Sequence, residues 1–218
     1  MKKITAIFLA SVMMLGLMAG CTGGNNTATQ PTTMPTQEST APTQAPTQPT
    51  TMPTEPTQAG TATGTSAQIL SKIWEGYSEN ERFACYGGTV EHSVNDAPGD
   101  LDMGNTEEIT NKYMLPEDQL ANVEAGASLV HLMNSNIFTA AAFQLKEGTD
   151  LRAAAKALRD NLQKTQWICG QPDHLLVADV EGHLLMAFAA KEGMDTFRQK
   201  LTDAYSGATI IYDEAVTA

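Results

Sequence analysis

Apolar and polar positions alternate with a helical period in three stretches after residue 66. Apolar residues recur every three or four positions over residues 69–77, which is typical of one face of a helix, and Ser66 is placed to cap its start. The strongest pattern covers residues 149–166, with Thr149 as the expected cap and charged residues on the opposite face. A last helix is predicted over residues 194–205.

Strands are predicted where apolar runs are short and are bounded by turn residues. The runs cover residues 123–133, 137–145, 175–180, 183–189 and 208–212. Asn134-Ser135-Asn136 separates the first two runs and Glu181-Gly182 the next two, so each pair is predicted to form a hairpin.

Residues 86–105 are rich in Gly and Asp and show no period, so they are predicted to form a loop. A short helix is expected over residues 105–113, before Pro116. Strand pairs that alternate with helices predict an α+β domain, with a mostly antiparallel sheet and helices packed on one face in two layers.

The first twenty residues have a different pattern, in which Lys2 and Lys3 precede an apolar run over residues 4–18. The run is shorter than the ~20 residues of a membrane span and is typical of an export signal. It ends in Leu17-Met18-Ala19-Gly20-Cys21. At this motif the chain resembles the bacterial lipoprotein family, although Met18 stands where that family usually has Leu. The resemblance implies a signal peptide over residues 1–20 and a lipid on Cys21; an ordinary cleaved signal is the alternative.

Residues 21–65 lack the apolar positions of a core and contain seven of the ten prolines. This composition predicts a disordered tether that could reach on the order of 100 Å at ~3.1 Å per residue. Residues 66–218 remain and are expected to form a single domain.

Charge narrows the range of partners. The predicted domain holds 23 of the 25 acidic and 11 of the 13 basic residues, so the net charge of −12 lies on it. Such a surface repels phosphate backbones, which argues against nucleic acid as a partner and leaves cationic partners open.

Two cysteines fall within the predicted domain, Cys85 and Cys169. In an exported protein they could form a disulfide, and two separate buried thiols are the alternative. Neither cysteine has neighbours typical of a catalytic thiolate.

Candidate metal ligands do not follow a known spacing. His174 and His183 flank the second predicted hairpin but lack helical i,i+4 spacing, so they are interpreted as exposed residues at strand ends, and His131 as a hydrogen-bonded core residue. Acidic residues gather at Asp96, Asp100, Asp102, Glu107 and Glu108. Their order departs from an EF-hand loop, so no metal and no cofactor are assigned.

No catalytic residue is assigned either. The chain has no Gly-rich phosphate loop and no nucleophile elbow. Trp74 and Trp167 are both expected in the core, which leaves no cluster of aromatic residues for sugar binding.

A second resemblance covers roughly residues 106–212. It rests on Tyr113-Met114-Leu115, on Asp150-Leu151 at the start of a helix, on Gln163, Gln166 and Pro172, and on Leu175-Leu176-Val177-Ala178-Asp179 before a Gly-centred turn. In this order the chain resembles an uncharacterised domain family of clostridial and related Firmicute lipoproteins. The resemblance implies location and architecture, and the family has no established activity to transfer.

The protein is therefore expected to be lipid-anchored at the extracytoplasmic face of the cell membrane. Its domain is expected to be a non-catalytic binding or structural module, whose partner is an envelope protein or a cell-wall component. The alternative is a small envelope hydrolase whose carboxylates come together only in the fold.

Overall fold

The computed structural model describes residues 60–217, which belong to one compact unit. The predicted signal peptide, the predicted lipidation site Cys21 and the predicted tether up to residue 59 lie outside the described residues.

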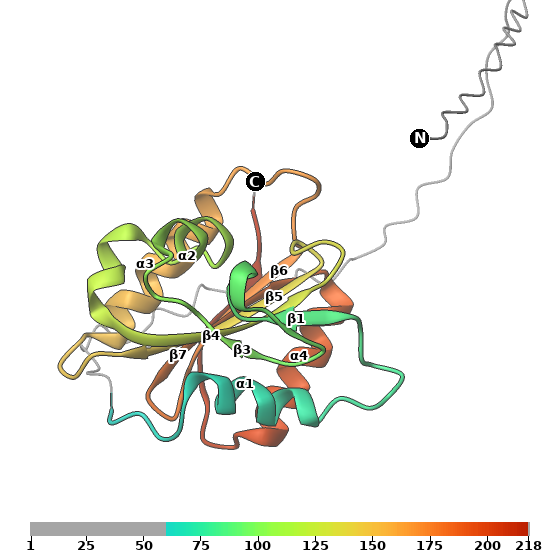
Figure 1. Ribbon diagram of the computed structural model, residues 1–218, viewed down its shortest axis with the longest axis horizontal. Helices are drawn as coiled ribbons and strands as arrows, with labels where there is room; N and C mark the ends of the chain where they lie inside the picture. Colours follow the sequence, from blue (N-terminus) through green and yellow to red (C-terminus); the bar gives the residue numbers. More distant parts are fainter. Residues whose placement is uncertain (1–59, 218) are drawn as a thin grey trace, which may run out of the picture. The chain divides into compact units, whose positions relative to one another are not determined.

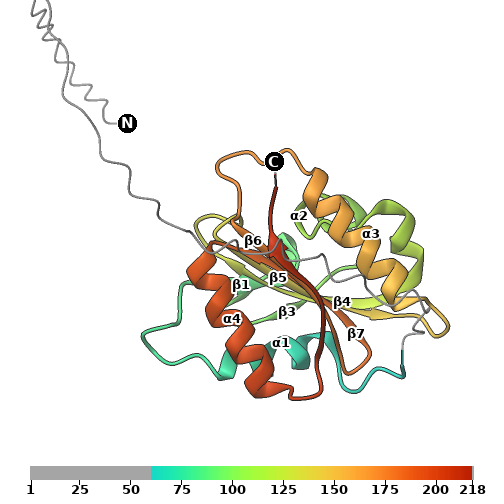
Figure 2. The same cartoon turned by 180° about the vertical axis from the view of Figure 1, so that it is seen from behind.

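Eight strands form a single antiparallel sheet (Figures 1 and 2). They are β1 (Cys85–Gly87), β2 (Val94–Asn95), β3 (Gly99–Asp100), β4 (Val123–His131), β5 (Phe138–Leu145), β6 (His174–Val180), β7 (His183–Ala189) and β8 (Thr209–Ala215). The order across the sheet is β2-β1-β4-β5-β7-β6-β8, and β3 pairs separately with β4. Both predicted hairpins, β4–β5 and β6–β7, are confirmed.

Four α-helices cover the sheet. They are α1 (Ser66–Glu75), α2 (Thr106–Lys112), α3 (Leu151–Lys164) and α4 (Lys191–Ala204), and two 3-10 turns lie at Val90–His92 and Glu117–Asn122. In Figures 1 and 2, α1 and α4 lie on one side of the sheet and α2 and α3 on the other. The α+β class with an antiparallel sheet is confirmed, whereas the helices occupy both faces rather than the one face expected.

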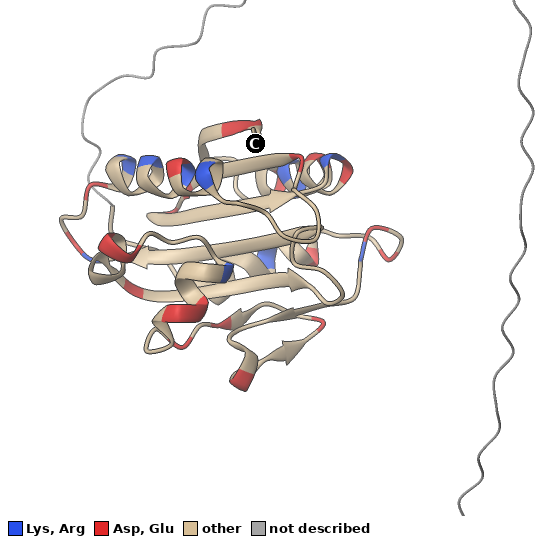
Figure 3. Cartoon of the chain, turned by 90° about the horizontal axis from the view of Figure 1, so that it is seen from above, with Lys and Arg blue, Asp and Glu red and all other residues tan. Residues whose placement is uncertain are grey.

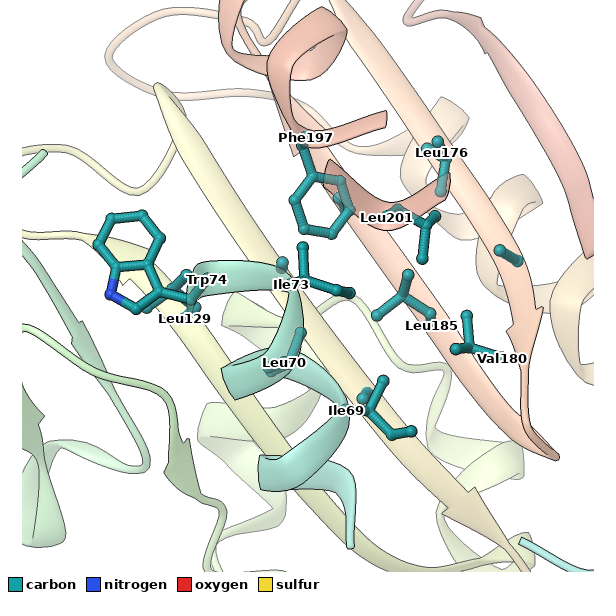
Figure 4. Packing of buried hydrophobic residues seen from close by; sticks show 14 of the residues in the cluster. Ile69, Leu70, Ile73, Trp74, Leu129, Leu176, Val180, Leu185, Phe197 and Leu201 are labelled. Carbon is teal, nitrogen blue, oxygen red and sulfur yellow. The ribbon is translucent and has the colours of Figure 1, made fainter. Parts of the chain in front are cut away.

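The central strands have apolar side chains on both faces, so a layer of helices is needed on each face to bury them. Ala140 and Ala142 of β5 belong to a core under α1 and α4, whereas Ala141 and Phe143 belong to a second core under α2 and α3. Figure 4 shows the first core, where side chains of α1 and α4 meet those of the sheet. Strands covered on both faces read as continuous apolar runs, which is the pattern of β5 and β7.

Helix α1 is capped by Thr65, one residue before the predicted cap Ser66. The Thr65 hydroxyl accepts the N–H of Gln68 and the Gln68 side chain accepts the N–H of Thr65, which completes a capping box. Ser66 instead lies inside the first turn and is buried.

The chain before α1 contacts the turn between β6 and β7. The N–H of Thr63 donates to the carbonyl of Glu181 at 3.1 Å. A Cβ at position 182 would lie 2.8 Å from the carbonyl oxygen of Gly60, so only glycine allows this approach. Residues 60–63, which were predicted to belong to the tether, therefore contact the β6–β7 turn of the domain.

Helix α3 begins at Leu151, with Asp150 rather than Thr149 as its cap. Its Arg159 binds Glu214 of the edge strand β8 with an Nη2–Oε2 distance of 3.1 Å. The next residue toward the N-terminus of β8, Asp213, binds Arg198 of α4 at 2.6 and 2.7 Å. Since neighbouring strand residues point to opposite faces, these two ion pairs attach β8 to one helix on each face.

Strands β1 to β3 lie in the segment that was expected to be a loop. They exist because glycines allow their backbones to come close together. A Cβ at Gly87 would lie 2.1 Å from the backbone nitrogen of Gly99. Within residues 60–217, no helix has the length and apolar character that crossing a bilayer requires.

Candidate functional site

The two histidines of the second hairpin lie at its opposite ends. His174 pairs with Ala189 in the β6–β7 register, whereas His183 pairs with Val180 beside the turn. His174 lies 3.5 Å from a carboxylate oxygen of Asp213. The register separates the two histidines by the length of the hairpin, so they do not form a metal site together.

His183 is fully buried, and its interpretation as an exposed strand-end residue was wrong. Neither ring nitrogen has a hydrogen-bond partner within the described part of the chain. Burial lowers the pKa of His183, and the nearby carbonyls of Glu181 and Val180 act in the opposite direction. The ring is therefore neutral at neutral pH.

His131 is hydrogen-bonded as expected, but it is only half-buried. Its Nδ1 accepts the N–H groups of Met133 and Asn134 at 3.2 and 3.4 Å. The ring stacks on Phe83, with 5.4 Å between the centroids. His131 thus shapes the start of the β4–β5 turn.

The acidic residues between positions 96 and 108 make separate local contacts. Asp102 accepts the N–H of Gly104. Glu108 pairs with Lys112 at 2.7 Å and accepts the N–H of Val90. Over residues 60–217, no group of three or more His, Cys, Asp or Glu side chains has a geometry that could hold a metal ion.

Cys85 and Cys169 are both free thiols, so they follow the alternative of two separate cysteines. Cys85 is buried in β1, and burial raises its pKa to about 11. Cys169 is exposed in the loop between α3 and β6, where the alternative had expected a buried thiol.

The carboxyl groups with perturbed pKa values favour the ionised form. The Lys200 ammonium, which hydrogen-bonds Glu81, lowers the pKa of that carboxyl to about 2. Lys156 lowers the pKa of Asp160 and Lys191 that of Asp195, in both cases through a hydrogen bond. A general acid needs a raised pKa, and every resolved carboxyl shift in the described residues goes downward.

The two tryptophans differ in their surroundings. Trp74 is buried in α1, which confirms its predicted core position. Trp167 is half-buried and packs edge-on against Phe188, with 5.0 Å between the centroids. Its Nε1 is buried and has no hydrogen-bond partner within residues 60–217.

The most unusual surface of the domain lies where the β4–β5 turn meets the loop between α3 and β6. Large apolar side chains are exposed there: Met133 is 82% and Ile168 81% exposed. Leu132 and Ile137, at the two ends of the same turn, are also exposed. We call these four residues the apolar tip. Exposed apolar groups gathered in one place are typical of an interaction surface.

Side-chain amides of the turn hold the second loop in place. Asn136 Nδ2 donates to the carbonyl oxygens of Ile168 and Gly170 at 2.8 and 2.6 Å. Asn134 Nδ2 donates to the carbonyl of Cys169 at 3.4 Å. Cys169 has a φ of 65°, a conformation that costs a non-glycine residue energy and that these bonds help to maintain.

A groove runs from the apolar tip along α2. It consists of two adjoining hollows of about 470 and 360 Å³, which share Asn111, Lys112 and Ser135. The first hollow extends to Val90 and Glu107, and the second to Trp167 and Ile168. Amide, hydroxyl, charged and apolar groups therefore line these adjoining hollows, which together we call the α2 groove.

Sequence reasoning missed this surface. The run 123–133 was taken as strand to its end, which placed Leu132 and Met133 in the sheet, whereas β4 ends at His131. One available signal was the presence of apolar residues on both sides of the polar turn Asn134-Ser135-Asn136.

The described residues thus present exposed apolar side chains next to a groove, and the carboxyl groups with resolved pKa shifts are ionised. Comparison of the chain with protein-family models, with curated proteins and with solved structures gave no match.

Proposed function

We propose that this protein is a lipoprotein anchored at the extracytoplasmic face of the cell membrane, and that its domain is a non-catalytic module that binds an envelope component. Anchoring is supported by Lys2 and Lys3, by the apolar run that follows them, and by Gly20-Cys21 at its end. The proline-rich stretch up to residue 59 supplies length between that anchor and the domain.

The observation that carries the binding function is the apolar tip. Met133 and Ile168 come from loops on different parts of the chain, and the amides of Asn134 and Asn136 hold them together. Exposing two large apolar side chains costs solubility and offers no stability to the domain. A partner that covers them accounts for their position.

The carboxylates favour binding over hydrolysis. Asp195 and Asp160 are each in ion pairs with basic residues of their own helices, and Glu81 pairs with Lys200 of α4. These pairs keep the carboxylates negatively charged, whereas glycoside hydrolysis requires one protonated carboxyl across a cleft from a second.

Replacement of the acylated residue tests the anchoring. We expect Cys21→Ser to release the protein into the medium or to leave it unprocessed, and to abolish incorporation of radiolabelled palmitate. The control is Cys169→Ser, which removes an exposed thiol of the domain and should change neither fractionation nor labelling. A Cys21→Ser protein that remained in the membrane fraction at mature size would contradict the proposal.

A further inference from the structure

The α2 groove and the apolar tip together have the features of a peptide-binding surface. We propose that they bind an extended polypeptide segment that presents apolar side chains next to cationic ones. This inference rests on the proposed binding function and names the chemistry of its partner.

The apolar side chains lie at both ends of the groove. Val90, which is 64% exposed, lines the hollow beside the start of α2, and Ile168 lines the hollow at the other end. Met133, which is 82% exposed, lies in the β4–β5 turn whose Asn136 binds the carbonyl of Ile168. An extended peptide places side chains at regular intervals along such a surface, so apolar residues of the peptide can reach both ends.

Between these ends the groove offers groups that can bind a peptide backbone. Asn111, Ser135 and Gln166 line it and are uncharged. Trp167 also lines it, and its buried Nε1 has no acceptor among residues 60–217. The amides and the hydroxyl of Asn111, Gln166 and Ser135 can donate to and accept from a peptide backbone.

The acidic residues around the groove favour a positively charged partner. Residues 79–124 carry eleven acidic and only two basic residues, and six of the seven residues around the first hollow come from this segment. Figure 3 shows that Lys and Arg lie mostly on helices, whereas Asp and Glu also occupy the loops. Lys112 in the groove is already paired with Glu108, which leaves Glu107 to attract a positive charge.

The same charge disfavours a second copy of this chain as the occupant. Each copy carries a net charge of −12, so two copies repel each other unless cations shield them. A cationic segment with apolar residues gains both from the field of the domain and from covering Ile168 and Met133.

The test uses a capped peptide of about ten alternating Leu and Lys residues, and two comparison peptides with Glu in place of Lys or Ser in place of Leu. The protein is the chain from position 21 with Cys21→Ser, so that no lipid takes part. Calorimetry at about 0.15 M salt should give a dissociation constant at least about tenfold lower for the Leu/Lys peptide than for either comparison peptide. The indole N–H resonance of Trp167 should shift during the titration.

Matched variants locate the binding. We expect Ile168→Asp and Glu107→Lys each to weaken binding about tenfold. Val94→Asp changes an exposed valine that does not line the groove, and Glu192→Lys changes another exposed first-turn glutamate on α4. These two controls should bind like the parent protein, and unchanged thermal unfolding would show that all four variants are folded.

Several outcomes would overturn the inference. They are equal binding of the Glu peptide, equal loss of affinity in the controls, and a titration that leaves the Trp167 resonance unmoved. Self-association that Ile168→Asp abolishes would identify a second copy as the occupant. Each of these results leaves the palmitate and fractionation tests unaffected, so failure of the peptide inference is distinguishable from failure of the proposed anchoring.

Discussion

The thiols of Cys85 and Cys169 differ in their access to solvent, and this difference can be measured. Cys85 is buried with its pKa raised to about 11, whereas Cys169 is exposed. In the folded chain with Cys21→Ser, a thiol reagent should therefore modify Cys169 rapidly and Cys85 only after unfolding, because the thiolate is the reactive form. Cys169→Ser should abolish the rapid phase. Rapid modification of both thiols would contradict the burial of Cys85.

His183 makes stability depend on pH in a defined direction. Burial lowers its folded-state pKa below the ordinary value of 6.5, so the unfolded chain binds the proton more readily. The contribution of His183 to the free energy of unfolding is constant at pH values above 6.5. It is lost as the pH falls below 6.5, at up to ~1.4 kcal/mol per pH unit.

Urea unfolding at about pH 7.5 and pH 5.5 measures this effect, since that interval lies above the ordinary titration range of carboxyl groups. His183→Gln should reduce the loss of stability between the two pH values. His92→Gln, at an exposed position, should leave it unchanged. An identical loss in all three proteins would show that His183 is not the group responsible.

Among the elements, α1 shows how the start of a helix depends on one hydroxyl rather than its neighbour. Thr65→Ala removes the capping box and should lower the free energy of unfolding by about 1 kcal/mol. Ser66→Ala removes a buried hydroxyl with no partner within the described residues, so it should be neutral or slightly stabilising. Urea midpoints compare the two variants, and a larger loss from Ser66→Ala would restore Ser66 as the cap.

The periodic pattern predicted the type and approximate position of most elements. The error in the caps of α1 and α3 is one residue in each case, because Thr65 and Ser66, like Thr149 and Asp150, are all suitable capping residues. Spacing identifies the region where a helix begins. The hydrogen bond that selects the cap forms only when the residues before the helix adopt their conformation in the folded domain.

For the whole molecule, the presence of helices on both faces is the main difference from the predicted architecture. Ala141 and Ala142 are neighbours in β5 and are both fully buried, one in each core. Ala141→Asp and Ala142→Asp should therefore each cost several kcal/mol, because each places a charge in an apolar interior. In a sheet covered on one face, one of the two would face solvent and cost less than about 1 kcal/mol.

Thermal or urea unfolding of the two variants measures this, with Thr209→Asp at an exposed position of β8 as the control. Severe destabilisation by both central substitutions and a small effect at position 209 is the expected result. A much smaller loss of stability from one of the two substitutions than from the other would contradict this and support a two-layer fold with helices on one face.

Features that depend on neighbours along the chain could be predicted from the amino-acid pattern alone. A helical period of three or four residues and an apolar run ended by turn residues are local properties, so α3, β4–β5 and β6–β7 could all be predicted. The excess of acidic residues was equally visible, as was the pattern around Cys21.

Features that depend on residues distant in sequence became visible only in the folded domain. Strands of two or three residues, such as β1 and β3, are too short to show a period and form because Gly87 can approach Gly99. The apolar tip arises because Asn136 reaches the carbonyl of Ile168 across 32 positions. His183 is fully buried in the folded domain although it lies beside a turn. Each of these depends on packing between segments, for which spacing along the chain carries no signal.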